Sequence, residues 1–451
     1  MKANKKEVDM IHGPLLGKMI AFTIPVILSG VLQLLFNAAD IIVVGRFAGN
    51  ESLAAVGSTS SLINLLVNLF MGLSVGANVT VAFYFGCDHR EKVRDTIHTS
   101  ITLSLVCGVF LSIFGMLTSH QLLVWMGSPD DVIGLATTYL QIYFLGMPAL
   151  LTYNFGAAIL RAIGNTRTPL YFLMASGIVN VVLNLVLVIG FSMDVAGVAI
   201  ATVVSEYISA ALVLYYLHKQ SDVMHFSFKY LGIKTDVLGR IIRIGLPAGL
   251  QSVMYTSSNI LIQSSVNALG TDTVAAWTAY SKIDSLFWMI VNAFGISITT
   301  FVGQNYGAGK MDRVHKGVRT CMGITAGATV LLSVILYNYA SICYQLFTTD
   351  AQVVVIGEQI LHFLVPTYFT YIAIEILSGT LRGIGDSWLP MIICCLGICA
   401  LRVVWILTAV PLKNDILTIV FSYPLTWTVT SIAFIVYYLF FSHLKIVGRK
   451  R

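Results

Sequence analysis

Charged side chains are scarce in this sequence. Only 11% of the 451 residues are Asp, Glu, Lys or Arg, whereas an average soluble domain carries about 25%. Hydrophobic residues make up 57% of the chain, which is more apolar surface than a soluble protein of this length can bury. A lipid bilayer accepts such a surface because lipid replaces water around it. The composition therefore excludes an ordinary soluble protein and predicts a membrane protein.

Motifs of nucleotide-driven pumps and of zinc metalloproteases are also absent. The chain contains no G-x-x-x-x-G-K-[ST] or H-E-x-x-H segment. Its seven cysteines form no C-x-x-C pair, and Cys394, Cys395 and Cys399 fall in an apolar stretch that is typical of buried thiols. We therefore expect no enzyme activity and no cofactor.

Long apolar stretches recur along the whole chain. A helix needs roughly 20 apolar residues to cross a hydrocarbon core, and each stretch reaches that length. The sequence therefore predicts an all-α polytopic membrane protein with twelve transmembrane helices. The first 18 residues are polar and the first apolar stretch is of full length, so we expect no cleaved signal peptide. The predicted helices are 17–44, 53–83, 95–117, 132–158, 168–190, 195–217, 240–266, 273–303, 318–340, 353–379, 389–410 and 416–442.

Basic residues are distributed unevenly between the predicted loops. All but four of the 27 Lys and Arg residues lie in the N-terminus, in alternate loops or in the C-terminus; the exceptions are Arg46, Lys282, Arg402 and Lys413. Cytoplasmic loops of membrane proteins carry such an excess. We therefore expect both termini in the cytoplasm and a multi-pass protein of the cell (inner or plasma) membrane. The net charge of +6 then reflects topology and does not indicate a nucleic-acid partner.

The sequence repeats itself with an offset of about 221 residues. Leu-Arg-Ala-Ile-Gly at 160–164 matches Leu-Arg-Gly-Ile-Gly at 381–385, and Pro25 matches Pro247. Six helices in each copy would give both copies the same orientation, as in parallel repeats of transporters. We predict two pseudo-symmetric six-helix lobes, 1–222 and 240–451, joined by a cytoplasmic linker at 223–239, with a substrate path where they meet. Because proline permits helix bending, Pro25 and Pro247 are predicted hinges.

The paired Leu-Arg-x-x-Gly segments and Val-Gly-Gln-Asn-Tyr-Gly-Ala-Gly at 302–309 give the chain a specific likeness. It resembles the multidrug and toxic compound extrusion (MATE) family over essentially its whole length. This resemblance implies a secondary-active antiporter that exports amphiphilic or cationic organic compounds in exchange for protons or sodium ions. It also implies twelve helices in two lobes. The prokaryotic NorM-like and DinF-like branches are the relevant comparisons.

The resemblance suggests where the coupling ion would bind. The DinF-like branch uses an acid late in the first helix and polar residues in helices five and six, positions that resemble Asp40, Asn180, Asn184 and Thr202. These four residues would hold Na⁺, or Asp40 would carry a proton. Asn184 departs from the aspartate usual there. The NorM-like branch uses acids in helices seven and ten, where this chain has Tyr255 and Tyr371. Neither set is intact, so the coupling ion stays open.

Polar residues within the first predicted helix share one face. Gln33, Asn37 and Asp40 follow i, i+4, i+7 spacing in an otherwise apolar segment. Ionisable groups inside a membrane are costly and are therefore functional candidates. Asp40 would be the principal coupling carboxylate; the alternative is a pairing with Arg46 near the membrane surface. Asn180 and Asn184 stand one turn apart, and their alternative role is structural bonding between helices.

The second half offers a further set of polar residues. Tyr255 and Asn259 lie one turn apart on the seventh predicted helix, and Glu375 and Arg402 fall in the tenth and eleventh. Because an isolated charge is costly in the membrane, we predict that Glu375 and Arg402 pair with each other. This pair would either tether two helices or form a second cation site.

Two other functions remain as alternatives to an antiporter. A lipid-linked oligosaccharide flippase of the same superfamily would need basic residues along its cavity to hold pyrophosphate, and few are present. A passive channel would carry rings of like residues, which the two-copy pattern does not supply. The expected partners are a small amphiphilic substrate and the bilayer, with the protein acting as a monomer.

Overall fold

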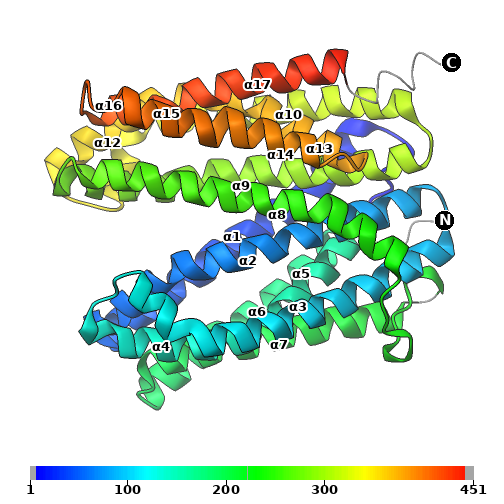
Figure 1. Ribbon diagram of the computed structural model, residues 1–451, viewed down its shortest axis with the longest axis horizontal. Helices are drawn as coiled ribbons and strands as arrows, with labels where there is room; N and C mark the ends of the chain where they lie inside the picture. The colour runs from blue at the N-terminus through cyan, green and yellow to red at the C-terminus, as the bar shows by residue number, and fades with distance from the viewer. Residues whose placement is uncertain (1–6, 221, 442–451) are drawn as a thin grey trace. The chain divides into compact units, whose positions relative to one another are not determined.

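A computed structural model describes residues 7–220 and 222–441 (Figure 1). Every described element of regular structure is helical, which confirms the predicted all-α class. Each of the twelve predicted stretches contains helix. By length and apolar composition, ten described helices qualify as membrane spans, or eleven if a bent pair counts as one. The one predicted stretch whose described helix does not qualify by both criteria lies in α8 (Thr235–Asn267). This helix has 33 residues and is long enough, but it carries several polar side chains.

The chain divides into two compact units, which do not coincide with its two halves in sequence. Unit 1 contains the chain up to Asp9 together with Ile24–Gly249, and unit 2 contains Met10–Thr23 and Leu250–Arg451. Helix α1 (Leu15–Phe47) and helix α8 therefore each contribute to both units. The chain passes from one unit to the other beside Pro25 and Pro247, the two predicted hinge residues. Both prolines lie inside continuous helices. Both chain termini lie outside the described residues, so their cytoplasmic placement stays a prediction.

Unit 1 is built mainly from the first half of the chain (Figure 1). Its long helices pack side by side, and one predicted span bends by 48° at Gly146. A π-helical turn, η1, continues α6 to complete another span. Besides most of α1 and the start of α8, its elements are α2 (Gly49–Gly86), α3 (Arg90–Trp125), α4 (Asp130–Leu145), α5 (Met147–Ala162), α6 (Arg167–Asn184), η1 (Leu185–Gly190), α7 (Asp194–Lys219), η2 (Asp222–Met224) and η3 (Phe228–Tyr230).

Unit 2 follows the same order of spans, with more interruptions (Figure 1). The tenth predicted span is broken by the 3₁₀ segment η4, and the eleventh contains the π-helical turn η5 in its middle. Its elements besides parts of α1 and α8 are α9 (Thr271–Gly307), α10 (Met311–Asn338), α11 (Ala340–Gln345), α12 (Ala351–Leu364), η4 (Val365–Tyr371), α13 (Ile372–Gly383), α14 (Trp388–Cys394), η5 (Cys395–Ala400), α15 (Leu401–Thr408), α16 (Ile416–Val420) and α17 (Ser422–Phe440).

The repeated Leu-Arg-x-x-Gly segments end a helix in the same way in both units. Gly164 follows α5 with φ +90°, and Gly385 follows α13 with φ +94°. This left-handed backbone is the reason that both copies need glycine. At Gly164 a side chain would also meet the carbonyl oxygen of Val8, whose amide donates to the Gly164 carbonyl at 3.0 Å. The repeat is thus visible in backbone geometry as well as in sequence.

Glycines allow α2 and the first part of α8 to touch within unit 1. Gly72 and Gly76 of α2 lie against Gly245 and Gly249 of α8. A Cβ atom placed on Gly72 would lie 2.2 Å from the backbone nitrogen of Gly249. Small residues spaced four apart let helix backbones approach closely in membranes, where packing rather than water drives association. These four residues form what we call the glycine seam.

The segment that precedes α1 is held by the end of α9 and the start of α10, all within unit 2. Asn305 donates to the Met10 carbonyl at 3.1 Å, and Arg313 donates to the carbonyls of Met10 and Gly13 at 3.3 and 2.9 Å. Met10 is fully buried. The segment 302–309 therefore forms the C-terminal end of α9, and through Asn305 it binds the segment that precedes α1.

Candidate functional site

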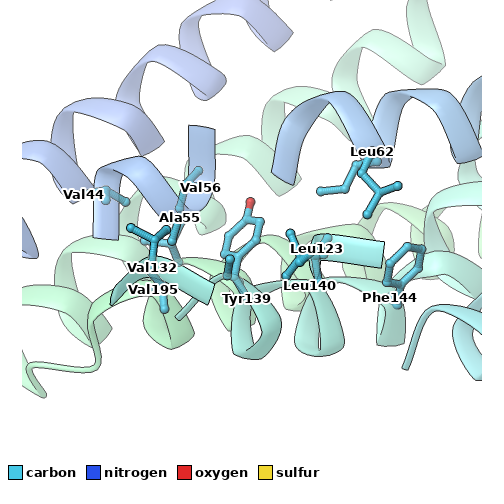
Figure 2. Packing of buried hydrophobic residues seen from close by; sticks show 14 of the residues in the cluster. Val44, Ala55, Val56, Leu62, Leu123, Val132, Tyr139, Leu140, Phe144 and Val195 are labelled. Atoms are coloured by element: carbon cyan, nitrogen blue, oxygen red, sulfur yellow. The ribbon is translucent and has the colours of Figure 1, made fainter. Parts of the chain in front are cut away.

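A hydrophobic core in unit 1 holds α1, α7 and the turn η1 that continues α6. These helices carry Asp40, Thr202 and the pair Asn180 and Asn184. Val43 and Val44 of α1, Val188 of η1 and Val195 of α7 are all buried in one cluster. Figure 2 shows part of this cluster, with Tyr139 of α4 among the apolar side chains. Because Asp40 lies one turn before Val44 and Asn184 one turn before Val188, the core brings both residues into the same region.

The four residues suggested by the family resemblance form one hydrogen-bond chain. The Asn184 Nδ2 group donates to Asp40 Oδ1 and, at 3.3 Å, to Asn180 Oδ1. Asn180 Nδ2 donates in turn to Thr202 Oγ1 at 3.4 Å, and the Thr202 hydroxyl donates to the Val198 carbonyl at 3.0 Å. Helices α1, α6 and α7 are therefore linked by polar side chains at one place inside unit 1.

The charge balance of this cluster is incomplete. Among the described residues, Asp40 forms no ion pair with Lys, Arg or His, so its predicted alternative partner Arg46 is not engaged. Asn184 is fully buried, and its Oδ1 atom has no hydrogen-bond donor. The site thus offers a carboxylate oxygen and amide oxygens, which are hard ligands of the kind that small hard cations prefer.

Two predicted residues of α1 lie outside this chain of hydrogen bonds. Gln33 and Asn37 are on the same helix as Asp40, but both side chains are exposed. They continue the polar face toward the N-terminus of α1. The structure therefore brings Asp40 together with Asn180, Asn184 and Thr202, and leaves Gln33 and Asn37 beside the cluster.

The predicted ion pair between Glu375 and Arg402 is wrong. Glu375 Oε1 lies 3.7 Å from Nη2 of Arg382, two turns further along the same helix. Arg402 instead donates from Nη1 to Asn259 Oδ1 at 3.0 Å. A long arginine side chain can fold back along its own helix, and Ser378 supports this conformation by accepting a hydrogen bond from Arg382 at 3.0 Å.

The two tyrosines that replace the NorM-like acids lie near each other in unit 2. Tyr371 is buried and donates to Glu375 Oε2 at 3.5 Å. The Tyr255 side chain of α8 lies close enough to Tyr371 to interact with it. Glu375 approaches α9 closely because Gly295 presents no side chain to it.

Sequence reasoning missed a third carboxylate within the spans. Asp284 of α9 accepts hydrogen bonds from Tyr368 at 2.7 Å, Trp288 at 2.7 Å and Tyr280 at 3.2 Å. It also missed Glu206 of α7, one turn after Thr202, whose Oε2 atom has no hydrogen-bond partner. Both are acidic residues inside predicted membrane helices, and the rule that selected Asp40 would have selected them.

These features define a multi-pass membrane protein with polar clusters inside its helical units. Within residues 7–220 and 222–441, no group of three or more His, Cys, Asp or Glu side chains could hold a metal ion. The Asp40 cluster is of a different kind because it has one carboxylate surrounded by neutral oxygens. Such a set suits a proton or an alkali cation.

The chain belongs to the MATE family of multidrug transporters. The MatE family model matches residues 25–186 and 247–408, one copy in each half. The chain is 27% identical to the probable multidrug resistance protein YoeA of Bacillus subtilis (strain 168) over 439 residues, 96% of this chain and 95% of the relative. It is 24% identical to the probable multidrug resistance protein NorM of Thermotoga maritima, covering 86% and 83% of the two chains.

Solved structures share the fold over the full length. The outward-facing conformation of a multidrug resistance MATE family transporter superposes with a TM-score of 0.91 and 22% identity, covering 99% of this chain and all of that one. The predicted two-lobe helical fold and the predicted family are therefore confirmed.

Proposed function

We propose that this protein is a secondary-active antiporter that exports amphiphilic or cationic organic compounds in exchange for protons or sodium ions. The relatives described above are named as multidrug resistance proteins, and a third, from Staphylococcus aureus, is named multidrug export protein MepA. The protein works as a monomer in the cell membrane with both termini in the cytoplasm. It needs no cofactor and carries out no enzymatic reaction.

The coupling ion binds at Asp40, Asn180, Asn184 and Thr202. The observation that carries this assignment is the continuous hydrogen-bond chain from Asp40 to Thr202, in which a carboxylate has no basic partner among the described residues. A cation would remove the cost of an uncompensated charge away from water. The unpaired Oδ1 of Asn184 supplies a second oxygen for a sodium ion, and a proton would need only Asp40.

Dye efflux from everted membrane vesicles tests this proposal. An imposed proton gradient and an imposed sodium gradient are applied in turn to wild-type protein and to Asp40→Asn. The asparagine keeps the side-chain shape but can no longer exchange a cation, so gradient-driven efflux falls at least tenfold. Asp131→Asn, which removes an exposed carboxylate at the start of α4, is the matched control and keeps wild-type efflux.

The two gradients distinguish the coupling ions. Efflux that follows only the sodium gradient and weakens in Asn184→Ala indicates a sodium site that uses the Asn184 oxygen. Efflux that follows only the proton gradient indicates protonation of Asp40. Wild-type efflux from a folded Asp40→Asn protein under both gradients would remove Asp40 from the mechanism.

A further inference from the structure

Arg402 carries a permanent positive charge in the interior of unit 2. Only 2% of the residue is exposed, although a guanidinium stays protonated in proteins. Its Nη1 atom donates to the Asn259 amide oxygen, its guanidinium carbon lies 4.3 Å from the ring centroid of Tyr423, and its Nε atom has no hydrogen-bond acceptor. A neutral oxygen and an aromatic face compensate a buried cation only in part.

The acidic residues of this region are engaged elsewhere. Among the described residues, Arg402 has no carboxylate within ion-pair distance. Asp284, which interacts electrostatically with the same Tyr423, already accepts hydrogen bonds from two tyrosines and a tryptophan. Glu375 pairs with Arg382. The counter-charge that Arg402 calls for is therefore not supplied by a described side chain.

A second unpartnered donor is linked to Arg402 through the ring of Tyr423. Trp427 of α17 is 1% exposed, and its Nε1 group has no acceptor. Its ring packs against Tyr423 at 5.4 Å and against Tyr371 at 5.7 Å between centroids. Tyr371 in turn faces Tyr255. A chain of contacts therefore runs from Asn259 through Arg402, Tyr423, Trp427 and Tyr371 to Tyr255. Its two ends, Asn259 and Tyr255, lie one turn apart on α8, so we call these six residues the circuit.

Three buried polar atoms of this circuit have no hydrogen-bond partner: Arg402 Nε, Trp427 Nε1 and the Tyr255 hydroxyl. All three can donate a hydrogen bond, and one of them belongs to a cation. Buried polar atoms normally have partners, so each exception calls for an explanation. Arg402 also follows directly after the π-helical turn η5, and such turns are frequent at functional sites.

We propose that Arg402 is the centre of an anion-binding site in unit 2 that takes the carboxylate of an aromatic or otherwise apolar organic acid. The guanidinium supplies charge and geometry for a carboxylate, Trp427 supplies a further N–H donor, and the aromatic rings contact the apolar part of the ligand. This inference deepens the proposed function. Binding of the carboxylate does not depend on the antiport mechanism, and only the export of such acids rests on the proposed function. The exporter would accept molecules that carry an acidic group as well as cations.

Equilibrium binding to the purified full-length protein in lipid nanodiscs tests the site. Benzoate is titrated by calorimetry, with benzamide as the neutral molecule of the same shape. Wild-type protein binds benzoate saturably and benzamide at least tenfold more weakly. Arg402→Gln lowers the affinity for benzoate at least tenfold, and Arg402→Lys, which keeps the charge but loses the fork of donors, lies between the two.

Two tryptophans provide a matched pair of variants. Trp427→Phe removes the unpartnered N–H and weakens benzoate binding severalfold. Trp405→Phe leaves binding unchanged, because Trp405 Nε1 donates to the Thr418 carbonyl at 2.8 Å. If Arg402→Gln proves unfolded by size-exclusion chromatography, these two variants and benzamide still decide the result.

Chloride is the alternative source of a compact anion. Competitive displacement of benzoate by chloride at constant ionic strength would show that the Arg402 site accepts small anions in general, whereas no displacement would show a preference for the carboxylate. Equal binding of benzoate and benzamide, or unchanged benzoate binding in folded Arg402→Gln, would overturn the proposal. Since the assay uses no gradient, a failure of the Asp40 coupling site would not affect it.

Discussion

Alanine substitutions at two glycines of α8 should change the stability of the protein in opposite directions, because one glycine lies in the glycine seam and the other does not. A Cβ atom on Gly249 would lie 2.3 Å from the Leu69 carbonyl oxygen, and its other nearest neighbours are also backbone atoms of Leu69. Ordinary contacts of a Cβ begin at 3.4 Å, so α2 and α8 would have to separate by about 1 Å or strain. Overpacking of this kind costs about 1–3 kcal/mol.

Gly239 is the matched control for this substitution. It lies on the same helix, nearly three turns earlier, in an exposed position with no atom within 4 Å of its added Cβ. Alanine there lowers the conformational freedom of the unfolded chain and improves helix propensity, so Gly239→Ala stabilises by about 0.5–1 kcal/mol. The two variants therefore differ by roughly 1.5–4 kcal/mol in the free energy of unfolding.

Thermal unfolding in one detergent, followed by tryptophan fluorescence, measures the two effects side by side. We expect Gly249→Ala to unfold at a lower temperature than wild type and Gly239→Ala at an equal or higher one. Monodisperse elution of both proteins at low temperature is the control for folding. If Gly249→Ala is as stable as Gly239→Ala, then α2 and α8 do not touch backbone to backbone, and the reasoning fails.

Three further predictions concern charged groups. Glu375→Gln and Arg382→Gln should each destabilise the protein, and the double variant should recover part of the loss, giving a coupling energy of about 0.5–3 kcal/mol in a thermal double-mutant cycle; additive losses would rule out the pair. Asp284→Asn should cost about 1–3 kcal/mol, because an amide cannot accept all three hydrogen bonds; an unchanged unfolding temperature would mean that the three donors find other partners. Asp415 accepts a hydrogen bond from the Thr418 amide at 2.6 Å and forms an ion pair with Lys413. These two contacts lower the pKa of Asp415 from 3.8 to about 2. Since the folded pKa is the lower one, its stabilising contribution is complete above pH about 4 and disappears as the pH falls toward about 2. Asp415→Asn should flatten the stability profile in that window, and a profile of unchanged slope would show that another group titrates there.

Much of the fold follows from hydropathy, since each apolar stretch of sufficient length forms helix. The interruptions do not follow from it. The bend at Gly146 adjoins Pro148 and the 3₁₀ segment η4 contains Pro366, and each proline removes a helical hydrogen bond, so these two interruptions have a local signal that hydropathy does not register. The π-helical turns η1 and η5 contain no proline and occur in apolar sequence, so a single sequence gives no comparable signal for them.

The candidate site could be predicted where the family resemblance indicated which residues lie close together in space. Asp40 and Asn184 are 144 residues apart, and only the resemblance indicated that they meet. Glu375 was paired with Arg402 by an estimate of depth in the membrane, yet Arg382 stands seven residues away on the same helix face. Spacing of i, i+7 predicts that contact directly. Asp284 was overlooked although its residue type alone marked it as a candidate.

The attachment of the N-terminal segment has a consequence for the order in which the protein is made. Met10 is synthesised some 300 residues before its partners Asn305 and Arg313. Unit 2 therefore cannot complete its fold until α9 and the start of α10 have been made and have bound this earlier segment. Contacts between such distant residues slow folding and prolong exposure of unfinished surfaces. Two half-proteins cut at the linker should accordingly each be incomplete when expressed alone and complement each other when produced together.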